Sequence, residues 1–345
     1  MRAVELVGFG GFEQLRYRVD TPVPCPQAGE VLIAIGGAGV NNTDINTRIG
    51  WYSKSVRSAT SAGGNGGFEE AEGEGWSGAQ FTFPRIQGID AAGRIVAVGE
   101  GVSAARIGER VLVEPALRRD DGRTDFFGSE CDGAFAEFAV APAAHSYRIE
   151  STLSDAELAS FPCAYSTAEN LLHRSGVGTG ERVLVTGASG GVGSAAVQLA
   201  KRRGAHVTAL AGTSKHAAVQ AIGADVVLDR YAPLAENDFD VVIDVVGGQS
   251  FPELLRALRS RGRYATSGAI SGPLVELDLR TLYLKDQTLY GCTALDPGVF
   301  ADLVGYIERG EIRPLVCETF PLEWIEAAQR LFLEKRHVGK IVLIP

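Results

Sequence analysis

The sequence predicts an α/β protein in which a doubly wound parallel sheet is joined to a second, β-rich domain. Two observations lead to this fold class. Between residues 183 and 269, short apolar runs alternate with helical patterns at the lengths typical of a parallel sheet covered by helices. Residues 1–50 instead contain short strand-like runs separated by turns rich in glycine and proline. A chain of 345 residues is long enough for two domains, and its order is β-rich, then α/β, then a short mixed return.

The β-rich part begins with three strand patterns, RAVELVG, LRYRV and EVLIAIGGAGV, and the turn TPVPCP separates the last two. Further strands are expected in PRIQGIDAAGRIVAVGEGV, GERVLVEP, AFAEFAV and HSYRI. In the mixed return, residues 297–310 and 322–335 have helical spacing, and the chain closes on the strand GKIVLIP.

Two polar stretches interrupt the β-rich part. Residues 53–79 are rich in Gly, Ser and Glu, and we expect a mobile loop or one ordered only by packing against something else. A solvated insertion and a lid over a substrate pocket are both open, and Phe68, Trp76 and Phe81 favour keeping the lid. Residues 116–133 are again polar and are expected to form a loop.

The α/β part starts with two helices. Ser154 has the chemistry of a helix N-cap, and Glu157 stands at the capping-box position. A second helix, STAENLLHRSG, leads to the apolar strand VLVT. Strand patterns recur at 207–210 and in VVLD, FDVVIDVVGG, GRYATSGA and LYLKDQTLYGCT, with AAVQAIGAD and LLRALR as helices between them.

A glycine-rich turn, TGASGGVG, joins the strand VLVT to the helix AAVQLAK. Strand, turn and helix form the first half of a unit that binds a dinucleotide at the helix N-terminus. The turn is a variant of G-x-G-x-x-G with Ala188 at the first glycine position; Gly190 would admit a pyrophosphate, and Gly193 would allow close helix–strand packing. The alternative is a glycine turn without a ligand. The expected cofactor contacts in this turn are Ala188, Ser189, Gly190, Gly191, Val192 and Gly193.

The carboxyl ends of the later strands are expected to lie along the nicotinamide half of the cofactor, because ligands bind at that edge of a parallel sheet. The residues concerned are Val246, Gly247, Ser267, Gly268 and Ala269. The second strand, ending in LAGTSKH, has no carboxylate to hold a ribose hydroxyl, whereas Thr213, Ser214 and Lys215 could bond a 2′-phosphate. We therefore expect NADPH, although Lys215 could also be an ordinary exposed lysine.

Composition excludes several classes of protein. The net charge of −9 argues against nucleic acid or an anionic membrane as the main partner. The N-terminus lacks the apolar core of a signal peptide, and no apolar run is long enough to span a bilayer. The five cysteines are odd in number and never in C-x-x-C spacing, which fits a reduced, cytoplasmic protein without a disulfide framework.

The order of four motifs, GVNNTD, QGIDAAGRIVAVGEGV, TGASGGVG and HVGKIVL, resembles the medium-chain dehydrogenase/reductase superfamily. Within it, the chain is similar to the zinc-independent quinone oxidoreductase and enoyl reductase branch. The resemblance implies a GroES-like catalytic domain at 1–150 and 296–345, a Rossmann domain at 151–295, and a cofactor in the cleft between them. It also implies a homodimer that pairs through the last sheet strand, near residues 287–292.

Zinc-dependent members of this superfamily carry Cys, His-Glu and a second Cys around a catalytic ion. At the matching positions this chain has Asn41, Ile89-Asp90 and Cys163. One thiol, an amide and an aliphatic side chain do not supply the three ligands that catalytic zinc needs. The cysteine-rich lobe of structural zinc is absent as well, so we expect no metal, and Cys163 is expected to be a buried small residue.

Without a metal, the chemistry rests on hydride donation and on hydrogen bonding to the reduced group. The stretch NNTDINTRIGWY resembles a segment of 2-enoyl thioester reductases that ends in a proposed proton donor, here Tyr52. Tyr52 could also be a packed aromatic. The resemblance further places Asn41 facing the nicotinamide and Thr43 at a proton-relay position, whereas Asp44 is expected to accept bonds from backbone amides.

The resemblance also bears on the cofactor. Lys215 matches a phosphate-binding lysine of quinone oxidoreductases, and Arg230 matches an adenine-side position. Lys340 is a candidate phosphate contact, although a surface lysine is an equal alternative.

The predicted activity is that of an NADPH-dependent, zinc-independent oxidoreductase acting on a small-molecule substrate, a quinone or an activated C=C. An alcohol dehydrogenase or carbonyl reductase without zinc is the first alternative. A non-catalytic NADPH-binding protein is the second.

Overall fold

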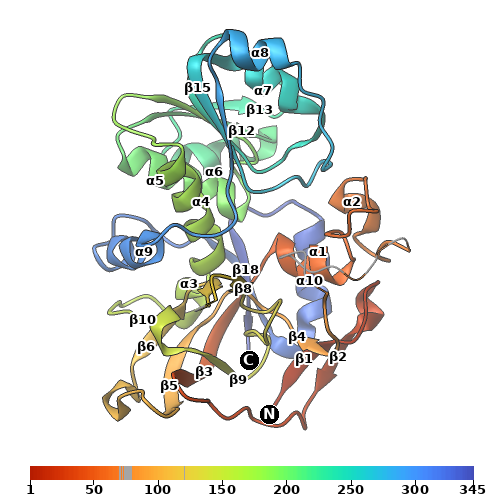
Figure 1. Cartoon of the computed structure of the whole chain (residues 1–345), viewed down its shortest axis with the longest axis vertical. Helices are drawn as coiled ribbons and strands as arrows, with labels where there is room; N and C mark the ends of the chain where they lie inside the picture. The colour runs from red at the N-terminus through yellow and green to blue at the C-terminus, as the bar shows by residue number, and fades with distance from the viewer. Residues whose placement is uncertain (70, 72, 74–79, 120) are drawn as a thin grey trace.

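The structure, a computed structural model, describes residues 1–69, 71, 73, 80–119 and 121–345. Figure 1 shows two lobes: a lower one built from both ends of the chain, and an upper one built from its middle. The blue C-terminal strand lies beside the red strands of the N-terminal lobe. Within the described residues, no helix is both long and apolar enough to cross a membrane.

The lower lobe is the β-rich domain. Over the described residues, seven strands form its main sheet, in the order β10-β6-β5-β3-β18-β17 with β9 also paired to β3. The register of β18 on β3 is antiparallel and pairs Val342 with Gly39. The strands of the sheet are β3 (Glu30–Val40), β5 (Ala92–Val98), β6 (Arg110–Val113), β9 (Phe138–Pro142), β10 (Ser146–Arg148), β17 (Val316–Pro321) and β18 (Lys340–Ile344). The C-terminal strand β18 therefore belongs to the sheet of the N-terminal lobe.

Two smaller sheets complete this lobe. One is built of β2 (Leu15–Arg18), β1 (Ala3–Leu6) and β4 (Arg85–Ile86), and the other is the hairpin of β7 (Ala116–Arg118) and β8 (Thr124–Phe126). The hairpin corrects the expectation of a loop over 116–133. Its apolar residues Leu117 and Phe126 are buried, so packing holds strands that are too short to show a sequence period.

The upper lobe is a Rossmann domain. Its parallel strands lie in the order β13-β12-β11-β14-β15-β16, which is the 3-2-1-4-5-6 order of dinucleotide-binding sheets. The strands are β11 (Arg182–Val185), β12 (His206–Ala211), β13 (Val226–Asp229), β14 (Phe239–Asp244), β15 (Leu258–Thr266) and β16 (Thr288–Gly291). The strand order reverses between β11 and β14, so the ligand site is expected at the carboxyl ends of these two strands.

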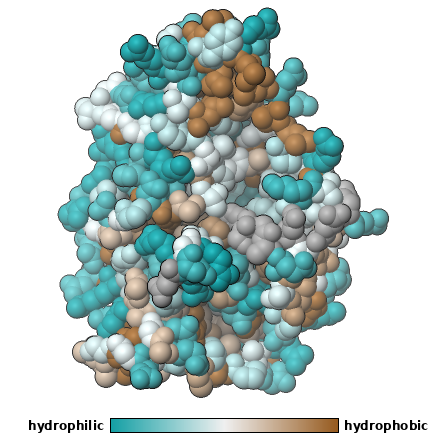
Figure 2. All heavy atoms as spheres, in the orientation of Figure 1, coloured by the Kyte–Doolittle hydropathy of each residue, from teal (hydrophilic) through white to brown (hydrophobic). Residues whose placement is uncertain are grey.

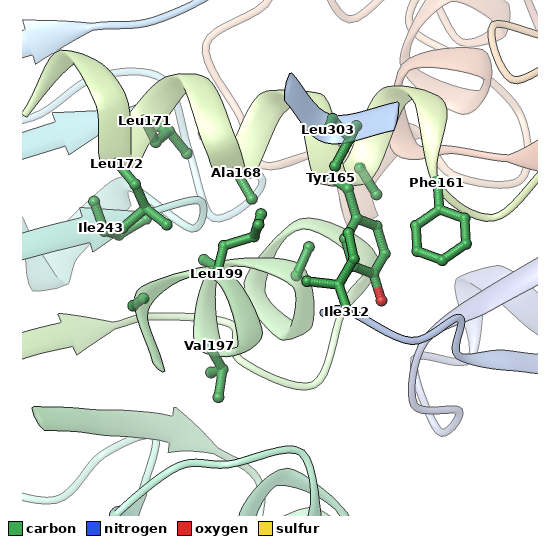
Figure 3. Packing of buried hydrophobic residues seen from close by; sticks show 14 of the residues in the cluster. Phe161, Tyr165, Ala168, Leu171, Leu172, Val197, Leu199, Ile243, Leu303 and Ile312 are labelled. Atoms are coloured by element: carbon green, nitrogen blue, oxygen red, sulfur yellow. The ribbon is translucent and has the colours of Figure 1, made fainter. Parts of the chain in front are cut away.

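The helices cover the sheets and connect the lobes. They are α1 (Asn42–Arg48), α2 (Thr60–Gly63), α3 (Asp155–Leu158), α4 (Pro162–Arg174), α5 (Gly191–Arg202), α6 (His216–Ala221), α7 (Phe251–Ala257), α8 (Leu279–Leu284), α9 (Val299–Glu308) and α10 (Ile325–Leu333). Figure 3 shows how α4 packs on α5, with Tyr165 and Leu199 in the core between them. The α4–α5 pair holds the glycine turn in place, because α5 begins directly after that turn.

Local signals for helix α3 are confirmed. The Glu157 amide donates to Ser154 Oγ at 3.2 Å, and the Ser154 amide donates to Glu157 Oε2 at 2.8 Å. This reciprocal pair is the capping box that the sequence indicates.

Candidate functional site

The glycine turn lies where the sequence predicts, between β11 and α5. A Cβ atom on Gly193 would collide with the Gly187 carbonyl, which explains glycine there. At Gly190 a Cβ would meet Gly187 O at an ordinary 3.5 Å, so no atom of the described chain requires glycine at this position. Gly190 is the N-cap of α5 and carries no side-chain cap, which leaves the helix N-terminus open to a phosphate.

The loops after β14 and β15 meet at the carboxyl edge of the sheet. The Ser271 amide donates to the Val246 carbonyl at 2.9 Å, and a Cβ on Gly247, whose φ is +64°, would lie 3.0 Å from Ala269 Cα. A Cβ on Gly268 would likewise lie 3.0 Å from Val245 O. The predicted nicotinamide contacts Val246, Gly247, Ser267, Gly268 and Ala269 are thus brought together.

Asp244, which the sequence analysis did not single out, organises this edge. Its buried carboxylate accepts bonds from Thr186 Oγ1 at 2.6 Å, Tyr264 Oη at 2.5 Å and the Val246 amide at 2.9 Å. These bonds satisfy an otherwise costly buried charge and fix the turn after β14. The sequence signal that could have identified Asp244 was its position at the carboxyl end of a predicted parallel strand.

Cationic side chains gather around the end of β12. Lys215 Nζ donates to the Lys335 carbonyl at 2.6 Å and lies 3.4 Å from Ser189 Oγ. The Arg230 guanidinium lies against Gly212, where a Cβ atom would displace it. Burial, and then repulsion by Arg230, lower the pKa of Lys215. This crowding of positive charge is typical of a site that receives an anion.

The other two predicted contacts beside Lys215 differ. Thr213 Oγ1 donates to Asp229 Oδ2 at 2.8 Å, so its hydroxyl already has a carboxylate partner. Ser214 is exposed next to Lys215.

Lys340 is buried, and its ammonium forms the centre of a polar cluster. Lys340 Nζ donates to Asn41 Oδ1 at 2.5 Å and to Asp90 Oδ2 at 2.6 Å. The remaining oxygen of Asp90 accepts a bond from the Cys163 amide at 2.6 Å. The stem of Lys340 runs beside Gly191, so the cluster adjoins the glycine turn. Lys340 is therefore no surface lysine, and its charge is paired with Asp90 rather than turned toward a phosphate.

Asn41 has both ends of its amide engaged. Its Nδ2 donates to Asp90 Oδ2 at 2.8 Å and to Gly39 O at 3.2 Å, while Oδ1 accepts from Lys340. Neither amide hydrogen is left for a substrate in this arrangement. The Asn41 backbone amide donates to Asp44 Oδ2 at 2.7 Å, as expected for Asp44. Burial raises the pKa of Asp44 to about 7, and this hydrogen bond acts in the opposite direction.

The donor set at the metal position does not fit zinc. The site holds an amide, the aliphatic Ile89, the carboxylate of Asp90 and a thiol, and the Lys340 ammonium already lies against two of them. Burial, with the Asp90 charge adding to it, raises the pKa of the Cys163 thiol far above its ordinary value, which disfavours a thiolate ligand. Across the described residues, no cluster of His, Cys, Asp and Glu suited to a metal occurs. Zinc independence remains a prediction.

Tyr52 and Thr43 are brought together beside this cluster. Tyr52 Oη donates to Thr43 Oγ1 at 3.1 Å. Burial raises the pKa of Tyr52 to about 12, although Thr43 and Asn46 favour the ionised form. A phenol with this pKa keeps its proton at neutral pH, so it suits a hydrogen-bond donor to a carbonyl better than a free proton source. Asn46 Oδ1 is buried and unpartnered among the described residues.

Family models match both domains. The alcohol dehydrogenase GroES-like domain model matches residues 27–151, and the zinc-binding dehydrogenase model matches residues 191–309.

Relatives match over nearly their full length. The chain is 31% identical to the quinone oxidoreductase of Lama guanicoe over 362 residues, which cover 100% of this chain and 97% of that protein. It is 29% identical to the acryloyl-coenzyme A reductase of Metallosphaera sedula over 362 residues, 99% of each chain. A solved structure from Sinorhizobium meliloti is 46% identical, with a TM-score of 0.89 over 100% of this chain and 96% of that one.

Two further solved structures concern the cofactor. One is described as an NAD-dependent alcohol dehydrogenase, 29% identical with a TM-score of 0.85, and covers 100% of both chains. The other is mycobacterial Rv1454c complexed with NADPH, 28% identical with a TM-score of 0.78, and also covers 100% of both chains. The chain therefore belongs to the medium-chain dehydrogenase/reductase superfamily and is an oxidoreductase that uses a nicotinamide cofactor.

Proposed function

We propose that this protein is an NADPH-dependent, zinc-independent reductase that transfers hydride to a quinone or to the activated C=C of an enone, enal or enoyl compound. The observation that carries the proposal is the Lys340 ammonium between Asn41 and Asp90, where zinc-dependent relatives would bind their metal. Because the Lys340 ammonium occupies this position and is already bonded to Asn41 and Asp90, Tyr52 is the group suited to polarise an acceptor oxygen. The relatives named quinone oxidoreductase and acryloyl-coenzyme A reductase support this class of acceptor.

The chain's own residues fit the cofactor. The open N-terminus of α5 and the turn from Ala188 to Gly193 would hold the pyrophosphate. Lys215 and Arg230 would hold the 2′-phosphate, and the loops at 246–247 and 267–269 would lie along the nicotinamide. The bound cofactor supplies a hydride to the acceptor carbon.

Tyr52 would donate a hydrogen bond to the acceptor carbonyl as hydride reaches the β-carbon. Negative charge then develops on that oxygen, and a donor placed beforehand stabilises it. Thr43, which now accepts the Tyr52 hydrogen, would hold the phenol in place until the acceptor enters. A proton from solvent at the α-carbon completes the saturated product.

Methyl vinyl ketone and NADPH test this reaction directly. We expect stoichiometric NADPH oxidation and a saturated ketone.

Tyr52→Phe should lower kcat by about 100-fold while the Kd for NADPH stays unchanged, because the phenol would bond the acceptor and not the cofactor. Tyr17→Phe, on strand β2, is the matched control and should leave kcat unchanged. Full activity of Tyr52→Phe would refute the role of Tyr52.

The cofactor preference depends on Lys215. Lys215→Ala should weaken NADPH binding by about 10- to 100-fold and leave NADH binding unchanged, because only NADPH carries the 2′-phosphate.

The affinity for NADPH should also depend on pH. Because the pKa of Lys215 is lowered, its charge is lost at a lower pH than in a free lysine. NADPH affinity should therefore fall with rising pH in the alkaline range, while NADH affinity does not. Fluorescence titration measures both, and a wild-type preference for NADH would contradict the assignment.

Two alternatives have their own outcomes. An allylic alcohol as product would indicate a carbonyl reductase acting through Thr43 and Tyr52. Tight NADPH binding without turnover of any enone, quinone or aldehyde would indicate a non-catalytic NADPH-binding protein.

We also propose a homodimer and a cytoplasmic location. Among the described residues, strand β16 ends the parallel sheet, and exposed apolar side chains lie on it or in the segment that leads to it: Leu274, Leu279, Tyr283, Leu284 and Leu289. A second copy paired along this edge would cover them. All five cysteines are free, which fits a reducing compartment.

A further inference from the structure

Residues 53–69, the continuous described part of the insertion, form a compact loop. The two ends of the loop meet at Ile49, because the Phe68 amide donates to the Ile49 carbonyl at 3.1 Å. Trp51 Nε1 closes the first half by donating to Ser58 O at 2.9 Å, and Val56 is buried inside. Of the states expected for the insertion, these residues show the loop ordered by packing, whereas Trp76 lies outside the described part of the chain.

Arg48 anchors the base of this loop. Its fully buried guanidinium donates to Gly64 O at 2.8 Å, to Gly10 O at 2.8 Å and to Gln329 Oε1 at 2.9 Å. It also lies 4.3 Å over the centre of the Phe12 ring. A buried cation needs all of its partners, so these bonds fix the loop against the catalytic domain.

The tip of the loop reaches the other domain. The Thr60 amide, at the start of α2, donates to the Ile270 carbonyl at 3.1 Å. Thr60 is 4% exposed, and its hydroxyl has no partner within the described residues. Ile270 directly follows the predicted nicotinamide contacts at 267–269. Figure 1 shows α2 on the same side as α1, level with the junction of the two lobes.

We propose that residues 53–69 form a strap that joins the two domains on the Tyr52 side of the cofactor site and sets the size limit for the hydride acceptor. The chain enters the strap directly after Tyr52, and its tip rests beside the nicotinamide loop. An acceptor held by Tyr52 with its reacting carbon at the nicotinamide therefore meets the strap as its outer wall. Compact quinones and short enones fit inside such a wall, whereas acceptors with fused or bulky substituents do not. This inference rests on the proposed function.

Thr60→Pro removes the bridging amide hydrogen together with the threonine side chain. Proline is tolerated at the first helical position, where the amide makes no bond within the helix. Ala59 already has the extended backbone, with φ −64° and ψ 152°, that a residue before proline requires. Thr60→Ala is the matched control, because it keeps the amide and deletes the side-chain hydroxyl, unpartnered within the described residues, together with the γ-methyl group.

Calorimetry on the NADP⁺ complex measures the binding affinity of quinones of different size and does not depend on turnover. Thr60→Pro should tighten binding of phenanthrenequinone relative to benzoquinone by about fivefold, the effect of one backbone hydrogen bond, and Thr60→Ala should leave the ratio unchanged. An unchanged ratio in Thr60→Pro, or a wild type that binds neither quinone, would overturn the proposal.

Hydrogen exchange provides the second measurement. In the wild type the Thr60 amide should be protected, and in Thr60→Pro the segment 267–273 should exchange faster than in Thr60→Ala. An unprotected Thr60 amide in the wild type refutes the strap even if the variant fails to fold. If the enzyme binds the quinones but reduces none, the proposed function is wrong. The calorimetric affinities and the hydrogen-exchange rates then still test whether residues 53–69 form the strap.

Discussion

Lys340 shows how one residue connects the two domains. Its ammonium lies against Asp90 and Asn41, and its stem passes Gly191 at the start of α5. A buried ion pair gains little net stability over an apolar pair, but losing one partner leaves an uncompensated charge. The pair is better understood as a device that holds Asn41 and Asp90 in a single arrangement beside the cofactor turn.

Lys340→Met should therefore destabilise the protein by about 3–5 kcal/mol, because Asp90 remains buried without its cation. Urea unfolding measures the change in the free energy of unfolding. In an Asp90→Asn background the same substitution should cost much less, and an equal cost in both backgrounds would show that the charge pair is not the cause.

Individual residues were predicted where resemblance or local chemistry indicated them. Gly193 and Asp44 are examples, because a close approach and a helix start are local features. The partner of Lys340 was not predictable, since Asn41 lies 299 positions away and only the fold brings the two together. The same holds for Arg48, whose partner Gln329 lies 281 positions away.

Among elements, the Rossmann strands were predictable because each is a buried apolar run bounded by glycine turns. The hairpin of β7 and β8 was not, because its strands are three residues each and their polar neighbours dominate the pattern. For the loop at 53–69 the sequence left two states open, a mobile loop and one ordered by packing against something else, and the structure shows the second. Its composition is that of a mobile segment, yet the bonds from Arg48 and to Ile270 come from outside it.

On the scale of the whole molecule, the β16 end of the Rossmann sheet exposes apolar side chains that a single chain leaves in contact with water. Figure 2 shows apolar atoms gathered on the upper lobe, near the place of α8 in Figure 1. Leu284 is 70% exposed and Leu279 64%, both on α8, which precedes β16 in the chain, and β16 is an edge strand among the described residues. Open edges next to apolar surface are unstable toward association, so a defined dimer is the expected outcome.

The variant Leu279→Lys/Leu284→Lys should convert the proposed dimer to a monomer at micromolar concentration, because pairing two copies would bury four lysines at one interface. Sedimentation equilibrium measures the mass directly. Val226→Lys is the matched control, since Val226 is an exposed apolar residue at the opposite edge strand, β13. It should leave the dimer intact. A monomeric wild type would refute the dimer, and dissociation of the Val226→Lys protein would move the interface to the other edge of the sheet.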